Sequence, residues 1–193
     1  MIAEQPRDAL NTYVVSMTKH PSDILLVCFL QMQAKIETPL PVVPLFETQT
    51  DLHNAVNCME TLFKIPWYLK QLKGSVEIMI GYSDPVKESG YLSAAWGQYC
   101  AQEGLIKIAL ENQLKISFFH GRGGSICRGG GSIHDSMLSI PPKSLTSQFR
   151  VTQQGEVIHD RFGTTELSLE TLLNYSSSTL LAGAKHFPMP KLT

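Results

Sequence analysis

Short apolar runs alternate along the chain with longer segments whose apolar residues recur at helical spacing. Four or five of the runs have the length and the β-branched or aromatic content of strands. They span residues 13–17, a run centred on Val42 and Val43 that ends at Phe46 and Glu47, residues 76–80, residues 116–119, and, as the fifth, residues 149–152.

The segments between these runs predict helices. Residues 24–33 follow Ser22 and Asp23, and a second helix follows Thr50 and Asp51, all side chains that favour helix N-caps. Further helical segments span 66–72, 89–112 and 167–182, the last one capped by Thr164 or Thr165. The second helix has a single apolar face, made of Leu52, Ala55, Val56, Met59, Leu62 and Phe63.

A strand followed by a helix, repeated several times, predicts an α/β fold in which crossover helices join parallel strands. Polar candidates come directly after the apolar runs: Glu47 follows the second, Asp84 the third, and His120 and Arg122 the fourth. The carboxyl ends of parallel strands share one edge, where (β/α) barrels and open sheets keep their active sites. We therefore expect two carboxylates and a group of cations to lie together.

The composition limits the kinds of partner that the chain can have. Its 193 residues fit one domain, and its formal net charge of -1 predicts no general attraction to nucleic acid or to an anionic membrane. No apolar run is long enough to cross a bilayer, and residues 1–10 lack the apolar core of a signal peptide. The four cysteines have no paired spacing, which argues against a zinc or disulfide framework and favours a reduced, cytoplasmic setting.

A glycine-rich loop follows the fourth run. Glycine fills six of the eleven positions from 121 to 131, and Arg122 and Arg128 are the only charged side chains among them. Glycine lets the backbone approach a ligand closely, and arginine pairs well with carboxylate and phosphate oxygens. The pattern predicts an anion site, and the alternative is a solvated loop with incidental charges.

Two other interpretations do not fit this loop. The dinucleotide-binding fingerprint needs a third glycine where Ile126 stands. The Arg-Gly-Gly triplets that begin at Arg122 and Arg128 resemble RNA-binding boxes. Such boxes occur in long, repeated, disordered tracts of basic proteins, and this chain has no basic surplus. We therefore predict no nucleic-acid partner.

Glu47 and Asp84 are oxygen ligands of the kind that Mg²⁺ or Mn²⁺ prefers, with substrate oxygens and water completing the shell. The alternative is a pair of solvated or helix-capping acids. Lys87 comes three residues after Asp84, and near a metal its pKa could be lowered for proton transfer or anion binding. Otherwise Lys87 is an exposed lysine, and His120 on its own would be a structural, hydrogen-bonding histidine.

Two stretches resemble active-site signatures of the phosphoenolpyruvate carboxylase family. The lysine-bearing signature corresponds to Ile78-Met-Ile-Gly-Tyr-Ser-Asp84-Pro-Val-Lys87-Glu-Ser-Gly90, and the family's glycine loop corresponds to Phe119-His-Gly-Arg-Gly-Gly-Ser-Ile-Cys-Arg-Gly-Gly130. Residues 43–48, 93–96, 139–142 and 150–156 also agree. The resemblance covers nearly the whole chain in order. It implies that residues 1–193 are one partial catalytic segment, from the central and C-terminal part of the family's (β/α) barrel.

The resemblance also implies an activity. The family's enzymes are cytoplasmic lyases that add bicarbonate to phosphoenolpyruvate with Mg²⁺ or Mn²⁺, giving phosphate and oxaloacetate, a tricarboxylic acid cycle intermediate. Glu47 and Asp84 match the metal ligands. The residues matched to catalysis are Lys87, His120, Arg122 and Arg128, and those matched to substrate binding are Arg122, Arg128, Gly123 and Gly124.

The sequence departs from the family pattern in several places. Pro85 replaces a usual serine, Glu88 a usual aspartate, and Cys127 a glycine. Pro85 removes a backbone donor from the turn that carries Asp84. The Thr-Ala-His-Pro motif of the family is absent. Lys19-His20-Pro21 contains a similar His-Pro pair, but it stands at a different place in the family's order.

Family members are several times longer, and their barrel has eight strands. We therefore expect a truncated or split chain whose incomplete barrel has two open edges. Such a chain would be inactive alone and would need the missing segments or a homo-oligomer like the family's tetramer. The alternatives are a non-catalytic remnant or interaction module of the same fold, and a general phosphate-binding module.

Overall fold

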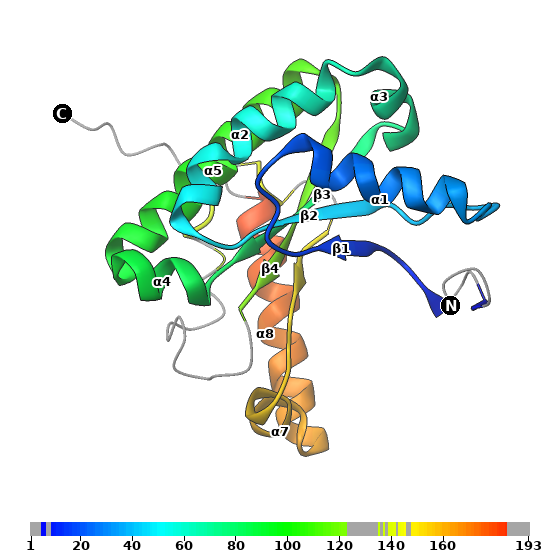
Figure 1. Ribbon diagram of the computed structural model, residues 1–193. Coiled ribbons are helices and arrows are strands. Elements are labelled where there is room, and N and C mark those ends of the chain that lie inside the picture. Colours follow the sequence, from blue (N-terminus) through cyan, green and yellow to red (C-terminus); the bar gives the residue numbers. More distant parts are fainter. Residues whose placement is uncertain are drawn as a thin grey trace.

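The computed structural model describes residues 5–6, 9–122, 135, 137, 139–141, 143–145 and 148–184. Five strands form one sheet in which every neighbouring pair is parallel, in the order β1-β2-β3-β4-β5 (Figure 1). The strands are β1 (Tyr13–Val15), β2 (Val42–Phe46), β3 (Ser75–Gly81), β4 (Lys115–Gly121) and β5 (Arg150–Val151). The predicted α/β class and the parallel strands are confirmed, and within the described residues the sheet is open, with β1 and β5 at its edges.

Helices form the connections that the sequence pattern predicts. Between the first four strands lie α1 (Pro21–Gln33), α2 (Gln49–Phe63), α3 (Pro66–Leu72), α4 (Ser83–Ser89) and α5 (Tyr91–Glu111), while α7 (Glu156–Phe162) and α8 (Thr165–Ala184) follow β5. The single helix predicted over 89–112 was wrong at its start, because Gly90, with φ 79°, separates α4 from α5. The sequence pattern also missed α7.

The first two helices begin earlier than predicted, because Asp23 and Asp51 occupy the third helical position rather than the N-cap. Oδ2 of Asp23 accepts hydrogen bonds from the Lys19 and His20 backbone N–H groups, each at 2.9 Å. These bonds hold the pKa of Asp23 below its ordinary value. Thr48 and Asp51 exchange hydrogen bonds of 3.0 and 3.1 Å in the same way. The Lys19-His20-Pro21 triplet is thus the start of α1, with Pro21 at a position where a missing N–H costs nothing.

The hydrophobic core lies on one face of the sheet. Every second residue of the central strands, including Phe46, Ile78, Ile80 and Phe118, is buried against the helices that cover this face. From the helices, the core receives Ile24 of α1, the predicted apolar face of α2, and Leu105 and Ala109 of α5. The register pairs Phe46 with Ile80 and Ile80 with His120, so these side chains share the helix-covered face.

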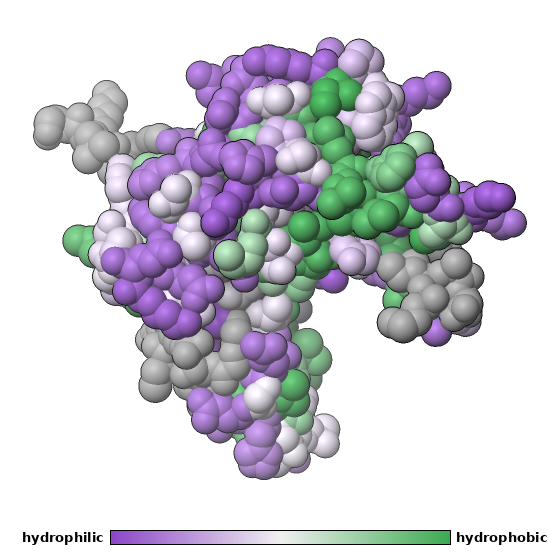
Figure 2. Space-filling view, in the orientation of Figure 1, coloured by the Kyte–Doolittle hydropathy of each residue, from purple (hydrophilic) through white to green (hydrophobic). Residues whose placement is uncertain are grey.

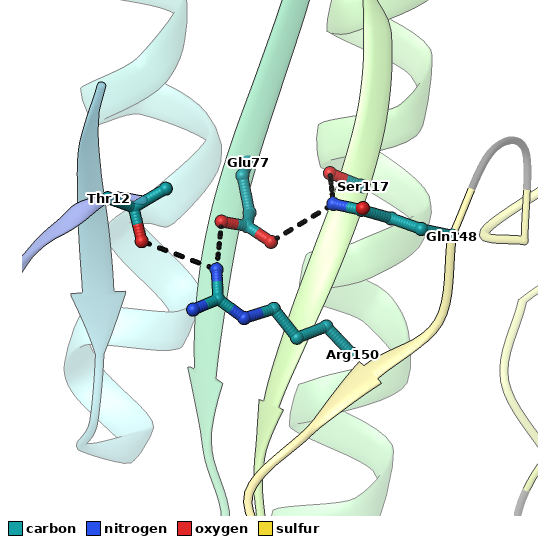
Figure 3. A network of polar contacts seen from close by, with 5 residues as sticks. All are labelled: Thr12, Glu77, Ser117, Gln148 and Arg150. Atoms are coloured by element: carbon teal, nitrogen blue, oxygen red, sulfur yellow. Dashed lines mark hydrogen bonds and ion pairs between the residues drawn. The ribbon is translucent and has the colours of Figure 1, made fainter. Parts of the chain in front are cut away.

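The opposite face of the sheet carries a polar network beside apolar side chains such as Val43 and Leu45, which alternate with the core-facing residues of β2. Figure 3 shows this face toward the viewer with helices behind the sheet. Arg150 on β5 crosses β4, with its guanidinium carbon 4.1 Å from the centre of the Phe119 ring, and forms an ion pair of 2.8 Å with Glu77 on β3. Gln148 donates to Glu77 at 3.3 Å and to Ser117 at 3.5 Å. Burial raises the pKa of Glu77, and the charge and hydrogen bond of Arg150 oppose that rise only in part.

The reach of Arg150 shows that the sheet is curved. Its Nη1 also donates to Thr12, the residue before β1, at 3.3 Å. In a flat sheet, four strand spacings of about 4.8 Å would place β1 and β5 about 19 Å apart. That exceeds the combined length of an arginine and a threonine side chain. The strands therefore curve toward the face opposite the core, and the network of Thr12, Glu77, Ser117, Gln148 and Arg150 lies on the concave side.

Helices α7 and α8 extend away from the sheet (Figure 1), and α8 has an inverted distribution of side chains. The positions of α8 that are not exposed carry mostly hydroxyl groups, such as Thr171, Tyr175 and Ser178. Its leucines are exposed: Leu167, Leu169, Leu172, Leu173, Leu180 and Leu181. Exposed apolar side chains also gather on α1, at Leu26, Phe29, Leu30 and Met32. Figure 2 shows green hydrophobic surface over the α1 region and along the projecting part. No helix in the described part of the chain combines the length and the apolar character needed to cross a membrane.

We predict that Arg150→Met lowers the free energy of unfolding by about 2 kcal/mol, because it leaves the Glu77 carboxylate, 10% exposed, without its cation. The double variant Glu77→Gln/Arg150→Met should recover at least half of that loss, since no buried charge remains. Urea unfolding of the wild type, both single variants and the double variant measures the coupling. Lys64→Met is the control: it removes an exposed ion pair to Glu60 at 3.0 Å and should cost less than about 0.5 kcal/mol. If the losses of the two single variants simply add in the double variant, the energetic coupling between Glu77 and Arg150 is contradicted.

Candidate functional site at the carboxyl ends of the strands

The carboxyl ends of β2, β3 and β4 form a common rim, as the sequence pattern predicted. The register pairs Phe46 with Ile80, Ile80 with His120, and Gly81 with Gly121. Glu47 is the next residue after β2, Tyr82 the next after β3, and Arg122 the next after β4. Residues that lie far apart in the sequence therefore emerge side by side from neighbouring strands.

Glu47 is fixed at this rim by the chain that leaves β1. Its Oε2 accepts a hydrogen bond of 2.8 Å from the backbone N–H of Met17, a residue with φ 53°. The N–H of Thr18 then donates to the carbonyl of Leu45 at 3.2 Å. The β1–α1 connection thus folds over the end of β2 and orients the carboxylate.

Gly81 allows β2 and β3 to approach one another closely at the rim. A Cβ atom on Gly81 would lie 2.9 Å from the Cα of Glu47 and 3.1 Å from the carbonyl oxygen of Phe46. The carbonyl of Gly81 accepts a buried hydrogen bond of 2.7 Å from Gln98 of α5. The position of Glu47 therefore depends on the absence of a side chain on the neighbouring strand.

Asp84 and Lys87 lie in α4, not in the turn that the sequence pattern predicted. Their side chains form an ion pair of 2.8 Å and are 44% and 65% exposed, so the pair itself adds little stability. Pro85 lies in the first turn of α4, where backbone N–H groups have no partner within the helix. The departure at Pro85 therefore does not disturb the local fold.

The second departure, Glu88, has a structural partner. Its Oε2 accepts a hydrogen bond of 3.0 Å from the backbone N–H of Gln49, the first residue of α2. A carboxylate at a helix N-terminus is stabilised by the unpaired N–H groups and the helix dipole. The side chain of Gln49 in turn donates to the carbonyl of Ser93 at 3.4 Å. Glu88 and Gln49 together join the helices behind the rim.

His120 belongs to β4 and is buried. The predicted strand 116–119 was too short, because β4 continues to Gly121 and carries His120 onto the helix-covered face. The side chain is 1% exposed, its ring stacks on Phe149 with centres 5.0 Å apart, and its Nδ1 is 2.8 Å from the hydroxyl of Tyr82. Burial, together with the charge of Arg122, lowers the pKa of His120 to about 3. The imidazole is therefore neutral at neutral pH.

Arg122 extends over Tyr82 from the end of β4. Its backbone N–H donates to the carbonyl of His120 at 3.0 Å, which closes a three-residue turn at Gly121. Its guanidinium carbon lies 5.0 Å from the centre of the Tyr82 ring. Burial raises the pKa of Tyr82, while the charge and a hydrogen bond of Arg122 oppose that rise. Arginine, tyrosine and histidine thus form one connected group at the rim.

The rim offers two carboxylates, Glu47 and Asp84, as ligands for a hard cation. A carboxylate has about four acceptor sites, so the Met17 N–H on Glu47 and the Ser83 and Lys87 donors on Asp84 are compatible with a bound metal. The described residues contain no group of three or more His, Cys, Asp or Glu that could hold a metal. This donor set fits Mg²⁺, which is usually held by one or two carboxylates together with substrate and water oxygens.

Three residues of the predicted site, Gly123, Gly124 and Arg128, lie outside the described residues, as does the departure at Cys127. Among the described cysteines, Cys28 and Cys58 are buried and free, Cys100 is exposed and free, and burial raises the pKa of Cys58 to about 11. Sequence reasoning missed Tyr82 as a member of the site. Its signal was its place directly after β3, the same position relative to a strand that drew attention to Glu47.

The comparisons with known proteins agree with one another. The family model described as phosphoenolpyruvate carboxylase matches residues 1–192. The phosphoenolpyruvate carboxylase of Shewanella loihica is 48% identical over 191 residues, which is 99% of this chain and 22% of that protein. That of Acinetobacter baumannii is 46% identical over 190 residues, with 98% and 21% covered. That of Medicago sativa is 46% identical over 191 residues, with 99% and 20% covered. The chain thus spans about a fifth of the length of the curated relatives it matches.

We predict that Gly81→Ala lowers the free energy of unfolding by about 1–3 kcal/mol, because the added methyl group must separate β2 from β3 at Glu47. Urea unfolding measures the loss, and backbone amide NMR should show the largest shifts at Met17 and Glu47. Gly183→Ala in α8 is the matched control, since nothing lies within 4 Å of its new methyl group. It should be neutral or stabilise by up to about 1 kcal/mol. Equal effects of the two substitutions would contradict the close approach.

We predict that the His120 site loses stability as pH falls. The folded pKa of His120, about 3, lies below the unfolded value of 6.5, so the unfolded chain takes up the proton first. Its contribution is complete above pH 6.5 and declines toward pH 3. Between pH 6.5 and pH 5 the wild type should lose about 1.6 kcal/mol more than His120→Asn, because each pH unit well below 6.5 changes this contribution by about 1.4 kcal/mol.

Urea unfolding at several pH values measures this difference. His53→Asn replaces an exposed histidine of α2 and should keep the wild-type pH dependence. An equally steep dependence in His120→Asn would show that the buried imidazole is not its source.

Proposed function

The chain belongs to the phosphoenolpyruvate carboxylase family, and we propose that it forms part of that family's active site for carboxylation of phosphoenolpyruvate. The observation that carries the proposal is the placement of Glu47, Asp84 and Arg122 around the adjoining ends of β2, β3 and β4. Two acids and a cation from three strand ends suit a substrate that carries a phosphate and a carboxylate.

In this proposal Glu47 and Asp84 hold Mg²⁺ or Mn²⁺, which supplies positive charge to neutralise the phosphoryl oxygens. Arg122 and Arg128 bind the phosphate and the carboxylated intermediate, as donors whose fork matches paired oxygens. His120 supports this group from within the sheet. Lys87, held beside Asp84 by the 2.8 Å ion pair, supplies a further cation. The glycine loop, including Gly123 and Gly124, excludes water.

In the proposed reaction these residues stabilise negative charge that moves from one group to another. Bicarbonate attacks the phosphoryl group, the bond from phosphorus to the enol oxygen breaks, and carboxyphosphate and an enolate result. Carboxyphosphate releases carbon dioxide and phosphate, and the enolate carbon captures the carbon dioxide to give oxaloacetate. Fixed cations stabilise the enolate oxygen and the phosphate. Exclusion of water prevents protonation of the enolate carbon.

The curved sheet supports the further proposal that these strands are an arc of a (β/α) barrel. Successive strands are added on one side only, the helices of the core cover one face, and Arg150 spans the concave face to Thr12. A barrel needs the same one-way order and curvature. The remaining strands would come from polypeptide equivalent to the rest of the relatives, or from an oligomer.

We predict carboxylase activity when the chain is combined with polypeptides that span the rest of a relative such as the Shewanella loihica enzyme. Oxaloacetate formation with Mn²⁺ measures it. Lys87→Ala and Arg122→Ala should each reduce the rate by at least about 100-fold, the scale on which one charge-stabilising group acts. Lys64→Ala, which also removes a helical lysine from an ion pair, should leave the rate unchanged.

Manganese binding gives an independent measurement for the same mixtures. Electron paramagnetic resonance should detect Mn²⁺ bound by the wild type, with binding lost in Glu47→Gln and in Asp84→Asn. Absence of both activity and Mn²⁺ binding would reject the proposed function and favour a non-catalytic module of the same fold.

A further inference from the structure

Tyr82 connects the guanidinium of Arg122 with the imidazole of His120 at the rim. The roles inferred from the family signature do not include this tyrosine. Its hydroxyl is 2.8 Å from Nδ1 of His120, and the guanidinium carbon of Arg122 lies over its ring, 5.0 Å from the ring centre. The ring packs partly buried against the hydrophobic core. The phenol therefore lies where a rigid core meets a long side chain at the rim.

The hydrogen-bonding capacities of Arg122, Tyr82 and His120 define which group donates and which accepts in each contact. Arg122 carries donors only, so the Tyr82 oxygen can serve it only as an acceptor, and the lowering effect of Arg122 on the pKa of Tyr82 agrees with that role. The hydroxyl proton of Tyr82 is then directed at His120, and Nδ1 is the acceptor. A neutral imidazole that accepts at Nδ1 carries its proton on Nε2. A cation that donates to the phenol oxygen makes the O–H a stronger donor, so the two bonds reinforce each other.

We propose that Tyr82 is a positioning residue that orders the Arg122 guanidinium at the rim and selects the Nε2-protonated tautomer of His120. His120, which contacts the Tyr82 hydroxyl, is held rigidly, because it is 1% exposed and stacks on Phe149. A side chain as long as arginine loses much rotational freedom when it binds an anion. Tyr82 removes part of that freedom beforehand through its ring face and its hydroxyl.

The three-residue turn at Gly121 also helps to position Arg122. The bond from the Arg122 N–H to the His120 carbonyl turns the chain immediately after β4, and the Thr152 N–H donates to the same carbonyl at 3.0 Å. The backbone bonds thus fix the main chain of Arg122, while Tyr82 contacts its side chain. The predicted consequence for substrate binding rests on the proposed function, whereas the positioning itself does not.

Two substitutions separate the contributions of Tyr82. Tyr82→Phe keeps the aromatic face under Arg122 and removes the hydroxyl, and Tyr82→Leu removes both. Nitrogen NMR of labelled histidine and arginine in the full chain measures the tautomer of His120 and the mobility of the Arg122 side chain. We expect the Nε2-protonated tautomer in the wild type, a tautomer mixture in both variants, and Arg122 mobility that increases from wild type to Tyr82→Phe to Tyr82→Leu.

The expected kinetic effect in the reconstituted mixture is selective. Tyr82→Phe should raise KM for phosphoenolpyruvate about 5-fold, the effect of one hydrogen bond, with a smaller change in kcat, and Tyr82→Leu should raise KM further. Tyr99→Phe, which alters a half-buried tyrosine of α5 stacked on Trp96 at 5.7 Å, is the control and should change neither measurement.

The outcomes distinguish the two proposals. An Nδ1-protonated His120 in the wild type, or an Arg122 side chain equally ordered in Tyr82→Leu, would overturn the role of Tyr82 whatever the activity. A wild-type mixture that makes no oxaloacetate rejects the proposed function, while the NMR result on the full chain still decides the role of Tyr82. If a variant fails to fold, the other variant and the wild-type tautomer provide the decision.

Discussion

The one-way order of the parallel strands is the constraint on which the other features depend. Each new strand is added beside the preceding one, from β1 to β5. Crossover connections between parallel strands are right-handed, so strands added always on the same side place their helices on the same face. One face therefore holds the apolar core and the helices that cover it. All carboxyl ends emerge at one rim, and this brings Glu47, Tyr82 and Arg122 together.

The rim is a connected structure rather than a set of independent side chains. Gly81 permits the backbone of Glu47 to lie against β3, and Gln98 holds the carbonyl of Gly81 from behind. On the other side of β3, Tyr82 joins His120 to Arg122. A buried neutral histidine is costly to protonate, so the protonation state of this group does not change near neutral pH. The acidic and the cationic halves of the site are thus supported by the same strand.

The surfaces away from the rim show what the described residues leave uncovered. The concave face carries an ion pair and amide contacts beside its apolar side chains (Figure 3), and α8 turns hydroxyl groups inward and leucines outward. Exposed apolar surface of this kind marks sites where other polypeptide packs. The chain matches its curated relatives over about a fifth of their length.

The sequence by itself determined the alternation of strands and helices, the apolar face of α2, and the positions of Glu47 and Arg122 after their strands. Local periodicity and residue type are sufficient for these features. It placed helix starts and strand ends less well: Asp23 and Asp51 proved to be third-position acids, and β4 included His120. Only the tertiary structure decided that His120 points toward the core, that Glu88 caps α2, that Tyr82 joins the site, and that Arg150 reaches Thr12. These features depend on strand register and sheet curvature, which arise from contacts between residues far apart in the chain and leave no local pattern to detect.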